Sequence, residues 1–600
     1  MTSKPKPQAE TPLLDAETLA KLYADIAEKS SELLSKFMAR SSGGAPAFND
    51  ELGIAKAFYE AWQHMLANPR RIAEMQMKLW QDYTALWQGS MLKMFGQEAP
   101  PVVQPDKSDR RFRDEDWENN FVFDYVKQAY LIAARHFHQS LGGVEGLDEK
   151  TAKKVDFYTR QYVDALAPTN FLLTNPEALR ETVNTGGQNL VKGLHNLLED
   201  LAQGEGGQLR VRMTDTNAFR LGENIAASKG KVVFQNDIMQ LIQYAPLTEK
   251  VHATPLLIIP PWINKYYILD LRENNSFVRW VVEQGHTVFV VSWVNPDGRL
   301  AHKSFDDYLI EGSLAALDVI EDITGEKQAN VIGYCLGGTL LACTLAWLTA
   351  KKQQRIRSAT FFVSMIDFER PGELEVFIDE QQVSALEKKM EERGYLEGSE
   401  MATTFNMLRA NDLIWSFVVN NYLLGRDPFP FDLLYWNGDS TRMPAAMHSF
   451  YLRNMYLKNR LREPGGITLA GVPIDVTAIK TPAYFISTAE DHIAPWQSTY
   501  AGAQLLRGPV RFVLGGSGHI AGIINPPAAN KYCYWTNDKL PVQAADWLAG
   551  AEQHPGSWWT DWSRWVAGHA GQQVAARQPG SKRYPALEDA PGSYVRQRIA

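Results

Sequence analysis

The sequence predicts an α/β fold with an all-α domain in front of it. Up to about residue 215 the apolar residues recur at helical spacing, whereas beyond that point short β-branched runs alternate with helical stretches. Several of these runs are continuously apolar, as parallel strands covered on both faces require. We therefore expect a mostly helical N-terminal domain over residues 1–216 and a mostly parallel sheet with right-handed crossovers within residues 217–600.

Composition and charge exclude several classes of protein. The 600 residues are 45% hydrophobic and 11% aromatic, which suffices for a large core, and the net charge of −8 argues against nucleic acid as a partner. No run of about 18 apolar residues occurs, and the first residues lack the apolar segment of a signal peptide, so we expect a cytoplasmic protein without a membrane span. The 3 cysteines have neither the number of a disulfide framework nor metal-ligand spacing, so no metal site is expected.

The N-terminal domain is expected to begin with a polar segment and continue as a series of helices. Residues 1–12 are polar and contain prolines, so we expect them to be disordered. An amphipathic helix is expected from Leu19 to Phe37, a second helical stretch is expected to break at Asn68-Pro69, and the last helix is expected from Pro176 to about Leu201. The apolar stripe of the first helix can pack on the core, on a partner helix or on a hydrophobic polymer surface. The domain contains no cluster of catalytic residue types, so it is not needed to build an active site.

Seven β-rich runs define the second part of the chain. They are Lys231–Phe234, Leu256–Ile259, Val288–Val291, Asn330–Ile332, Thr360–Val363, Ala483–Ile486 and Arg511–Leu514. Between the third and the fourth run, Ser304 and Asp307 resemble a capping box, and the helix that begins there is expected to end at Gly325.

The connection between the fifth and the sixth run is too long for a simple crossover. A crossover takes about a dozen residues or a little more, but here residues 369–480 intervene. This insertion is charged and helical in pattern from Ser384 to Arg393, and it is rich in aromatic residues and prolines from Asp427 to Trp436. We expect it to form a lid over the active site.

The motif Gly333-Tyr334-Cys335-Leu336-Gly337 lies between the fourth run and an apolar helix. A G-x-nucleophile-x-G sequence on a strand-to-helix turn is typical of the nucleophile elbow of the α/β-hydrolase fold, where the central residue is usually serine. A thiol ionises more readily than a hydroxyl, and the positive end of the helix that begins at Leu336 stabilises the thiolate further. The alternative is the glycine-rich turn of a nucleotide-binding fold, but Cys335 occupies the position of the second glycine in that fingerprint.

The remaining catalytic candidates follow from the chain order of this fold, which is nucleophile, acid, histidine. After Cys335, Asp491 follows the sixth run and His519 follows the last run in a glycine-rich loop. Asp367, at the end of an earlier run, is the weaker candidate acid. His492 is the competing base, but a residue adjacent to the acid points elsewhere, so we interpret it as a supporting residue.

Two backbone N–H groups are predicted to bind the oxyanion. One is that of Leu336, directly after the nucleophile, and the other comes from the loop Pro260–Lys265, where Ile263 is the best candidate. Lys265 is interpreted either as a phosphate ligand or as a solvated side chain.

Four stretches carry a resemblance to a known family. PPWINKYYILDL, GYCLGGTLL, AEDHIAPW and GGSGHIAGIINPP resemble signature stretches of polyhydroxyalkanoate synthases, and the similarity extends from about residue 120 to the C-terminus. The length and the residues flanking Cys335 resemble the class I, short-chain enzymes. The resemblance implies polymerisation of (R)-3-hydroxyacyl-CoA, most readily 3-hydroxybutyryl-CoA, with Cys335, Asp491 and His519 at the catalytic positions. It also implies a homodimer at the surface of polymer granules with possible granule-associated proteins, and no cofactor, because the CoA thioester is the substrate.

The chemistry of a cysteine nucleophile agrees with this expectation. Attack of a thiol on acyl-CoA yields a thioester of nearly equal free energy, so the acyl group stays activated for transfer to a hydroxyl. The main alternative is a cysteine-type thioesterase or esterase, in which water accepts the acyl group, but a small, open lid would be typical of it. A granule-surface protein without turnover is the alternative from another class, and the intact Cys335, Asp491 and His519 argue against it.

Overall fold

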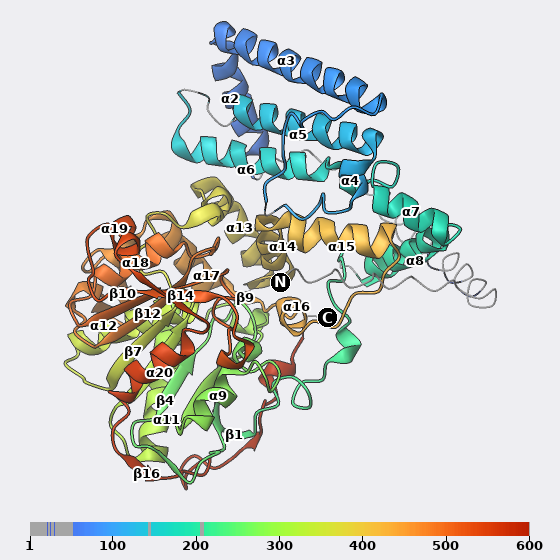
Figure 1. Ribbon diagram of the computed structural model, residues 1–600. Helices are drawn as coiled ribbons and strands as arrows, with labels where there is room; N and C mark the ends of the chain where they lie inside the picture. The colour runs from blue at the N-terminus through green and yellow to red at the C-terminus, as the bar shows by residue number, and fades with distance from the viewer. Residues whose placement is uncertain are drawn as a thin grey trace. The chain divides into compact units, whose positions relative to one another are not determined.

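The computed structural model describes residues 52–598 except 108, 142, 143, 145 and 204–208, together with Lys21, Asp25 and Lys29. The expected disordered segment 1–12, and all but these three residues of the helix expected from Leu19 to Phe37, lie outside the described residues. The chain divides into two compact units (Figure 1). Unit 1 consists of Met1–Asp215 with Phe405–Pro430, and unit 2 consists of Thr216–Thr404 with Phe431–Ala600. Residues 405–430, which the sequence analysis includes in the lid, thus belong to the same unit as the N-terminal helices.

Unit 1 is helical wherever it has regular structure among its described residues. Its elements are α2 (Ile54–Leu66), α3 (Pro69–Met94), α4 (Asp116–Asn119), α5 (Phe121–Leu141), α6 (Glu149–Ala165), the 3₁₀ turn Pro168–Asn170, α7 (Pro176–Asn184), α8 (Gln188–Gln203), the end of α14 (Gly398–Leu408), α15 (Ser416–Val418) and the π-helical turns Asn411–Trp415 and Val419–Leu423. The expected break at Asn68-Pro69 is confirmed, because Asn68 caps α3. The single helix expected from Pro176 to Leu201 is wrong: Gly186 and Gly187 both adopt positive φ and separate α7 from α8.

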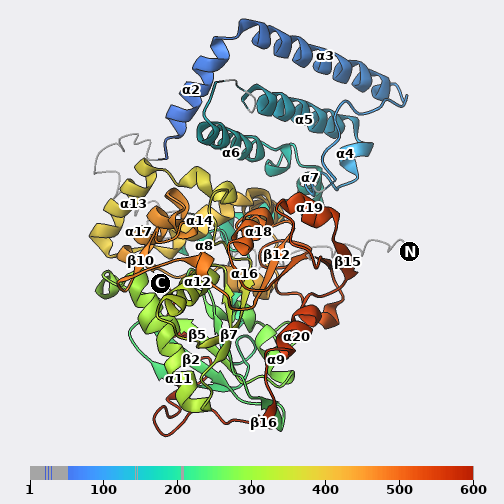
Figure 2. The same ribbon diagram turned by 90° about the vertical axis from the view of Figure 1, so that its left-hand side faces the viewer.

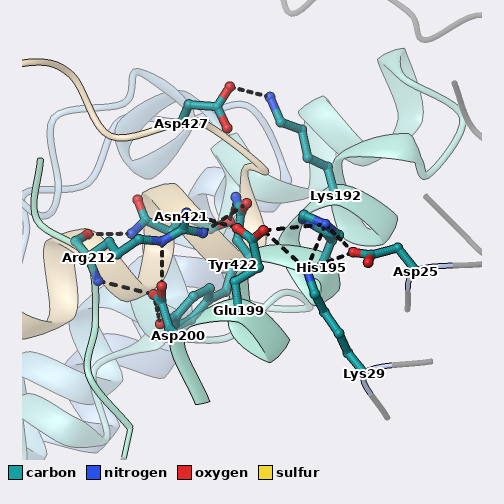
Figure 3. Close-up of polar contacts among 11 residues, drawn as sticks. Asp25, Lys29, Lys192, His195, Glu199, Asp200, Arg212, Asn421, Tyr422 and Asp427 are labelled. Atoms are coloured by element: carbon teal, nitrogen blue, oxygen red, sulfur yellow. Dashed lines mark hydrogen bonds and ion pairs between the residues drawn. The ribbon is translucent and has the colours of Figure 1, made fainter. Parts of the chain in front are cut away.

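Helix α8 packs closely against residues 421–425. A Cβ added to Gly193 would lie 2.0 Å from the carbonyl oxygen of Tyr422, so only glycine fits there. The carbonyls of Asn421 and Leu423 accept hydrogen bonds from Asn196 (3.1 Å) and Asn189 (2.7 Å). Figure 3 shows polar contacts of Asn421, Tyr422 and Asp200. The carboxylate of Asp200 is buried and accepts a hydrogen bond from the Tyr422 hydroxyl at 2.6 Å. Segments more than 200 residues apart in sequence, 189–200 and 421–425, therefore form one packed element pair.

Unit 2 is built on one 11-stranded sheet with the order β15-β14-β13-β12-β7-β6-β4-β5-β2-β1-β17. The strands are β1 (Gly230–Gln235), β2 (Met239–Tyr244), β4 (Leu256–Ile259), β5 (Val288–Trp293), β6 (Ala329–Tyr334), β7 (Ile356–Phe362), β12 (Ala483–Thr488), β13 (Val510–Gly515), β14 (Cys533–Thr536), β15 (Glu552–Pro555) and β17 (Glu588–Asp589); β3 (Lys250–His252) pairs separately with β16 (Gln573–Ala575). From β13 to β5 the strands run parallel, and both edges of the sheet are antiparallel. The expected mostly parallel core is confirmed.

Helices cover both faces of this sheet (Figures 1 and 2). In β4, Leu257 and Ile259 belong to one apolar cluster and Leu256 and Ile258 to another, because successive side chains of a strand point to opposite faces. The first face carries α11 (Ala315–Thr324), α12 (Leu336–Ala350), α18 (Trp496–Gln504) and α19 (Ala544–Ala549), and the second carries α9 (Phe277–Glu283) and α20 (Trp559–Ala567). Each parallel strand is therefore buried on both sides.

The helix expected between Ser304 and Gly325 is present, and its ends are as predicted. The capping box of Ser304 and Asp307 forms, and Gly325 ends the helix with φ 73°. Between α10 (Phe305–Asp307) and α11 the chain is π-helical, over Tyr308–Leu314. The sequence analysis did not predict this π-helical turn.

The rest of the insertion belongs to unit 2 and consists of short elements. They are the 3₁₀ turns Gly372–Phe377, Arg460–Arg462 and Val476–Ala478, helices α13 (Glu380–Arg393), α16 (Asp432–Asn437) and α17 (Ala445–Tyr451), the π-helical turn Leu452–Leu457, and the short strands β8 (Tyr395–Leu396), β9 (Met443–Pro444), β10 (Thr468–Leu469) and β11 (Val472–Pro473). The charged helix expected from Ser384 to Arg393 is confirmed as part of α13, which Asp379 caps.

Candidate active site

Cys335 lies on the turn between β6 and α12, in a backbone conformation that few residues adopt. Its φ is 51° and its ψ is −116°, and its N–H donates a hydrogen bond to the Phe362 carbonyl at 2.9 Å. A positive φ in a residue other than glycine costs free energy, which the surrounding structure must supply. The strain presents the side chain at the carboxyl end of the sheet, which is the geometry of a nucleophile elbow.

Three glycines make this turn possible. A Cβ on Gly337 would lie 1.9 Å from the Ile259 carbonyl oxygen. One on Gly338 would lie 1.9 Å from Ser364 Oγ, and one on Gly333 would lie 2.5 Å from the Gly338 Cα. The turn and the helix pack so closely that a side chain at Gly333 or Gly337 would collide with backbone, and one at Gly338 would collide with the Ser364 side chain. The motif therefore requires glycine at these positions for steric reasons.

Asp491 and His519 meet in a buried pair behind this turn. Asp491 Oδ2 lies 2.7 Å from His519 Nδ1, and Asp491 Oδ1 accepts hydrogen bonds from the N–H groups of Ile493 and Ala494, each at 2.8 Å. Because the carboxylate occupies Nδ1, Nε2 is the ring atom left to face a nucleophile. The loops that carry the pair are joined by a hydrogen bond from Glu490 N–H to the Ser517 carbonyl at 3.0 Å.

The surroundings of His519 favour its protonated form. Burial lowers the pKa of His519, but the negative charges of Asp491 and Cys335 and hydrogen bonds with both raise it more, to about 10. These two groups therefore stabilise the imidazolium form of His519 at neutral pH. A thiolate paired with an imidazolium is the reactive form of a cysteine nucleophile.

The loop Pro260–Lys265 follows β4 and is held mainly by its carbonyl groups. The Pro260 carbonyl accepts a hydrogen bond from Trp293 Nε1 at 2.8 Å, and the Lys265 carbonyl accepts one from Trp436 Nε1 at 2.6 Å. Thr441 donates from its hydroxyl to the Trp262 carbonyl and from its N–H to the Ile263 carbonyl. The loop is therefore attached to the insertion at Trp436 and Thr441.

The side chain of Lys265 is not solvated, contrary to one of the two expectations from the sequence. Its side chain is buried, with only 2% of the residue exposed, and Nζ donates to the Gln597 carbonyl at 2.5 Å. Burial lowers the pKa of Lys265 to about 8, although the charge of Asp439 opposes the shift. The lysine attaches the loop to the C-terminal segment of the chain.

Two tyrosines of the insertion lie near Cys335 and were not predicted. The rings of Tyr451 and Tyr456 are 5.7 Å apart, and the negative charge of Cys335 adds to burial in raising the pKa of both. Tyr451 ends α17, and Tyr456 lies in the π-helical turn Leu452–Leu457. A π-helix brings residues i and i+5 to nearly the same face. The sequence carries no pattern that signals such a turn.

Comparison with known proteins agrees with this geometry. A family model described as poly-beta-hydroxybutyrate polymerase (PhaC) N-terminus matches residues 108–281, and a model of the alpha/beta hydrolase fold matches residues 259–526. The chain is 48% identical to the poly(3-hydroxyalkanoate) polymerase subunit PhaC of Rhizobium meliloti, over 97% of this chain and 96% of that one. It is 46% identical to the subunit PhaC of Cupriavidus necator, over 88% of this chain and 89% of that one. The chain belongs to the poly(3-hydroxyalkanoate) polymerase family. The likeness also reaches further toward the N-terminus than the residue 120 from which the sequence resemblance was drawn.

In this polymerase the hydrogen-bond partners of Asp367 and Asp491 distinguish the two candidate acids. Asp367 accepts a hydrogen bond from Asn459 Nδ2 at 2.8 Å and lies 3.2 Å from Arg462 Nη1, so its carboxylate is engaged with the insertion. The acid bonded to His519 is Asp491. His492 is half-buried beside Asp491, and the base that shares the carboxylate is His519.

The described residues of the polymerase include neither a membrane-spanning helix nor a cluster of metal ligands. None of their helices is both long enough and apolar enough to cross a membrane. Within the same part of the chain, no three His, Cys, Asp or Glu side chains are grouped as ligands for a metal ion.

Proposed function

We propose that this polyhydroxyalkanoate polymerase joins (R)-3-hydroxyacyl-CoA monomers, most readily 3-hydroxybutyryl-CoA, through a covalent thioester on Cys335. The observation that carries the proposal is the buried pair of Asp491 and His519, whose geometry leaves Nε2 for the thiol of the strained turn. The raised pKa of His519 supports it, because a protonated imidazole stabilises the thiolate.

The first step transfers the acyl group to the enzyme. His519 takes the proton of the Cys335 thiol, and the thiolate attacks the thioester carbonyl of the substrate. The N–H groups of Leu336 and Ile263 bind the oxyanion of the tetrahedral intermediate. The C–S bond to CoA then breaks, and His519 returns the proton to the leaving thiolate, so that free CoA and an acylated Cys335 result.

The second step forms the ester of the polymer. The 3-hydroxyl of the acceptor loses its proton to His519 and attacks the acyl carbon on Cys335. The new C–O bond forms, the C–S bond to Cys335 breaks, and His519 returns the proton to the Cys335 thiolate. Asp491 orients His519 and helps to deprotonate this hydroxyl, which is less acidic than a thiol. Water must be kept from the thioester throughout, because hydrolysis would release a free acid.

The alternative is a cysteine-nucleophile thioesterase on the same residues. In that enzyme water would take the place of the hydroxyl in the second step. The insertion favours the polymerase, because Tyr451, Tyr456 and Phe368 pack their rings together next to the nucleophile, with centroids 5.0 Å to 6.1 Å apart. An apolar, aromatic surrounding disfavours water at the acylated cysteine.

The test is to incubate the purified protein with 3-hydroxybutyryl-CoA and follow CoA release together with turbidity. We expect both to rise in parallel, and neither to rise for Cys335→Ala. CoA release that yields soluble 3-hydroxybutyrate would favour the thioesterase. Substantial turnover by Cys335→Ala would contradict the covalent mechanism.

We further propose that the enzyme works as a homodimer at the surface of polymer granules, where it also meets granule-associated proteins. The exposed Trp62, Trp80 and Trp87 of α2 and α3 support this, since apolar surface of this size favours contact with polymer or protein. Light scattering and the localisation of a fluorescent fusion, compared between the wild type and Trp80→Ser, test it. Unchanged size and granule binding in the variant would count against these helices as the contact surface.

A further inference from the structure

The hydroxyl of Thr441 holds the peptide group that contains the predicted oxyanion donor. The Ile263 N–H belongs to the peptide between Trp262 and Ile263, whose carbonyl is that of Trp262. This carbonyl accepts the hydrogen bond of Thr441 Oγ1. A trans peptide is planar, with its N–H pointing opposite to its C=O. The bond that fixes the carbonyl direction therefore also fixes the direction of the Ile263 N–H.

The surroundings of Thr441 make this arrangement rigid. Thr441 is buried, its own N–H donates to the Ile263 carbonyl at 3.2 Å, and the adjacent residue Ser440 forms an antiparallel bridge with Asn264. Five residues earlier, Trp436 donates to the Lys265 carbonyl at 2.6 Å. Residues 436–441 thus run beside residues 262–265 of the loop and donate three hydrogen bonds to its carbonyl groups.

We propose that Thr441 is a positioning residue that aims the Ile263 N–H at the oxyanion, so that the insertion forms part of the oxyanion hole. The inference rests on the proposed function, because it takes Ile263 as the second donor. An oxyanion hole is effective when its donors are aimed in advance at the position where charge develops. Without the hydroxyl, the Trp262 carbonyl loses this partner and the peptide can rotate about its flanking bonds.

The consequence is a selective defect. Steps that pass through a tetrahedral oxyanion need the Ile263 N–H, whereas displacement of iodide from iodoacetamide by the thiolate involves no oxyanion. A loss of the Thr441 hydroxyl should slow the first kind of reaction and leave the second unchanged. A general loss of structure would slow both.

The test uses the full chain with Thr441→Val, which keeps the shape and removes the hydroxyl, and Thr441→Ser, which keeps the hydroxyl. Three rates are measured for each: CoA release in the first turnover from 3-hydroxybutyryl-CoA, acylation by p-nitrophenyl acetate, and alkylation of Cys335 by iodoacetamide. We expect both acylations to slow by about tenfold to a hundredfold in Thr441→Val, less than the loss of a whole donor. Alkylation should stay at the wild-type rate, and Thr441→Ser should acylate as the wild type does.

Two results would overturn the inference. One is wild-type acylation by Thr441→Val, and the other is an equal loss of acylation and alkylation in that variant. Failure of the proposed function looks different, because the wild type would then release no CoA from 3-hydroxybutyryl-CoA while p-nitrophenyl acetate still reported on the oxyanion hole.

Discussion

At the scale of single residues, the proposed mechanism makes the reactivity of Cys335 depend on the charge state of His519. Its pKa is raised from 6.5 to about 10, so the imidazole holds its proton across the neutral range as long as the thiolate and Asp491 face it. A raised pKa stabilises the folded state fully at pH values below 6.5, and this contribution disappears as the pH rises through about 10. His519 is thus available as a protonated partner for Cys335 at neutral pH.

The pH dependence of alkylation tests this pair. Between pH 7 and pH 9 the rate of Cys335 alkylation by iodoacetamide should change little, because the raised pKa of His519 keeps this neighbour protonated over the range. In His519→Gln the thiol must ionise alone, so the rate should climb by up to about tenfold per pH unit below the ordinary thiol pKa of about 8.5. Cys335→Ala supplies the background from Cys533. A steep rise in the wild type would show that the pair does not form.

Replacement of the acid separates the two steps of the reaction. We expect Asp491→Asn to retain part of the first-turnover CoA release but to slow polymer growth more strongly, because the acceptor hydroxyl is harder to deprotonate than the thiol. Rapid-quench CoA release and polymer mass measure the two steps. Asp367→Asn is the matched control, since the partners of this carboxylate are Asn459 and Arg462, and it should keep both. An equal loss of both steps in Asp491→Asn would leave it only the role of orienting His519.

The candidate-site residues could be proposed from the sequence, but the residues that hold the loop 260–265 in place could not. The elbow, Asp491 and His519 could be placed because each follows a strand in a fixed chain order. Lys265 could not, because a lysine in a loop is normally solvated, and its partner Gln597 lies 332 residues further along the chain. Thr441 and Trp436 contact the loop through backbone carbonyls, which leave no trace in side-chain patterns.

At the scale of elements, the strands that could be predicted are those whose apolar pattern is continuous. Strand β2 was missed because Gln240 and Gln243 lie within it and are buried. Their side-chain oxygens accept hydrogen bonds from the N–H groups of Ser593 and Gly580, at 3.1 Å and 2.9 Å, far along the chain. A buried glutamine whose hydrogen-bond partner lies hundreds of residues away cannot be distinguished from a surface glutamine in the sequence. The π-helical turns were missed for a related reason, because their period is neither that of a helix nor that of a strand.

A glycine tests the pairing of α8 with residues 421–425. Gly193→Ala should destabilise unit 1 by about 1–3 kcal/mol, because the added methyl group would overlap the Tyr422 carbonyl. Gly89→Ala, inside α3, is the control: its Cβ would make only an ordinary contact, 3.7 Å from Ala99, and alanine favours the helix. Thermal unfolding followed by circular dichroism compares the two. Equal melting temperatures for Gly193→Ala and the wild type would contradict the close packing.

At the scale of the whole molecule, a segment of the insertion belongs to the N-terminal unit, which the sequence did not reveal. The sequence analysis places the domain boundary at residue 216 and finds all catalytic candidates beyond it. The structure adds that residues 405–430, inside the insertion, pack with the N-terminal helices. The boundary near residue 215 could be recognised by the change from helical to strand-like patterns. The packing of residues 405–430 with the N-terminal helices depends on contacts between distant residues, such as Asn189 with Leu423 and Asp200 with Tyr422.

Removal of the N-terminal helices tests how far residues 405–430 depend on packing against them. A chain that begins at Asn217 keeps the elbow, Asp491 and His519, but it exposes the surface of residues 405–430 that α8 covers. We expect it to aggregate or to melt at a lower temperature than the full chain. A chain that lacks residues 405–430 as well should aggregate less and melt at a higher temperature than the chain from Asn217. Light scattering and melting curves distinguish them. A monodisperse chain from Asn217 with the stability of the full protein would show that 405–430 does not need α8.

The hydrogen bond between Lys265 and Gln597 also bears on when the enzyme becomes active during its synthesis. Gln597 follows Lys265 by 332 residues, and until residues 593–597 have left the ribosome, Lys265 lacks its carbonyl partner and Gln240 lacks the N–H of Ser593. Folding proceeds from the N-terminus as the chain emerges. The nascent chain therefore carries Cys335 outside the ribosome well before the loop beside it is secured. Polymer synthesis should begin only after Gln597 has emerged, and a reporter fused behind this segment needs a linker that leaves the Gln597 carbonyl free to reach Lys265.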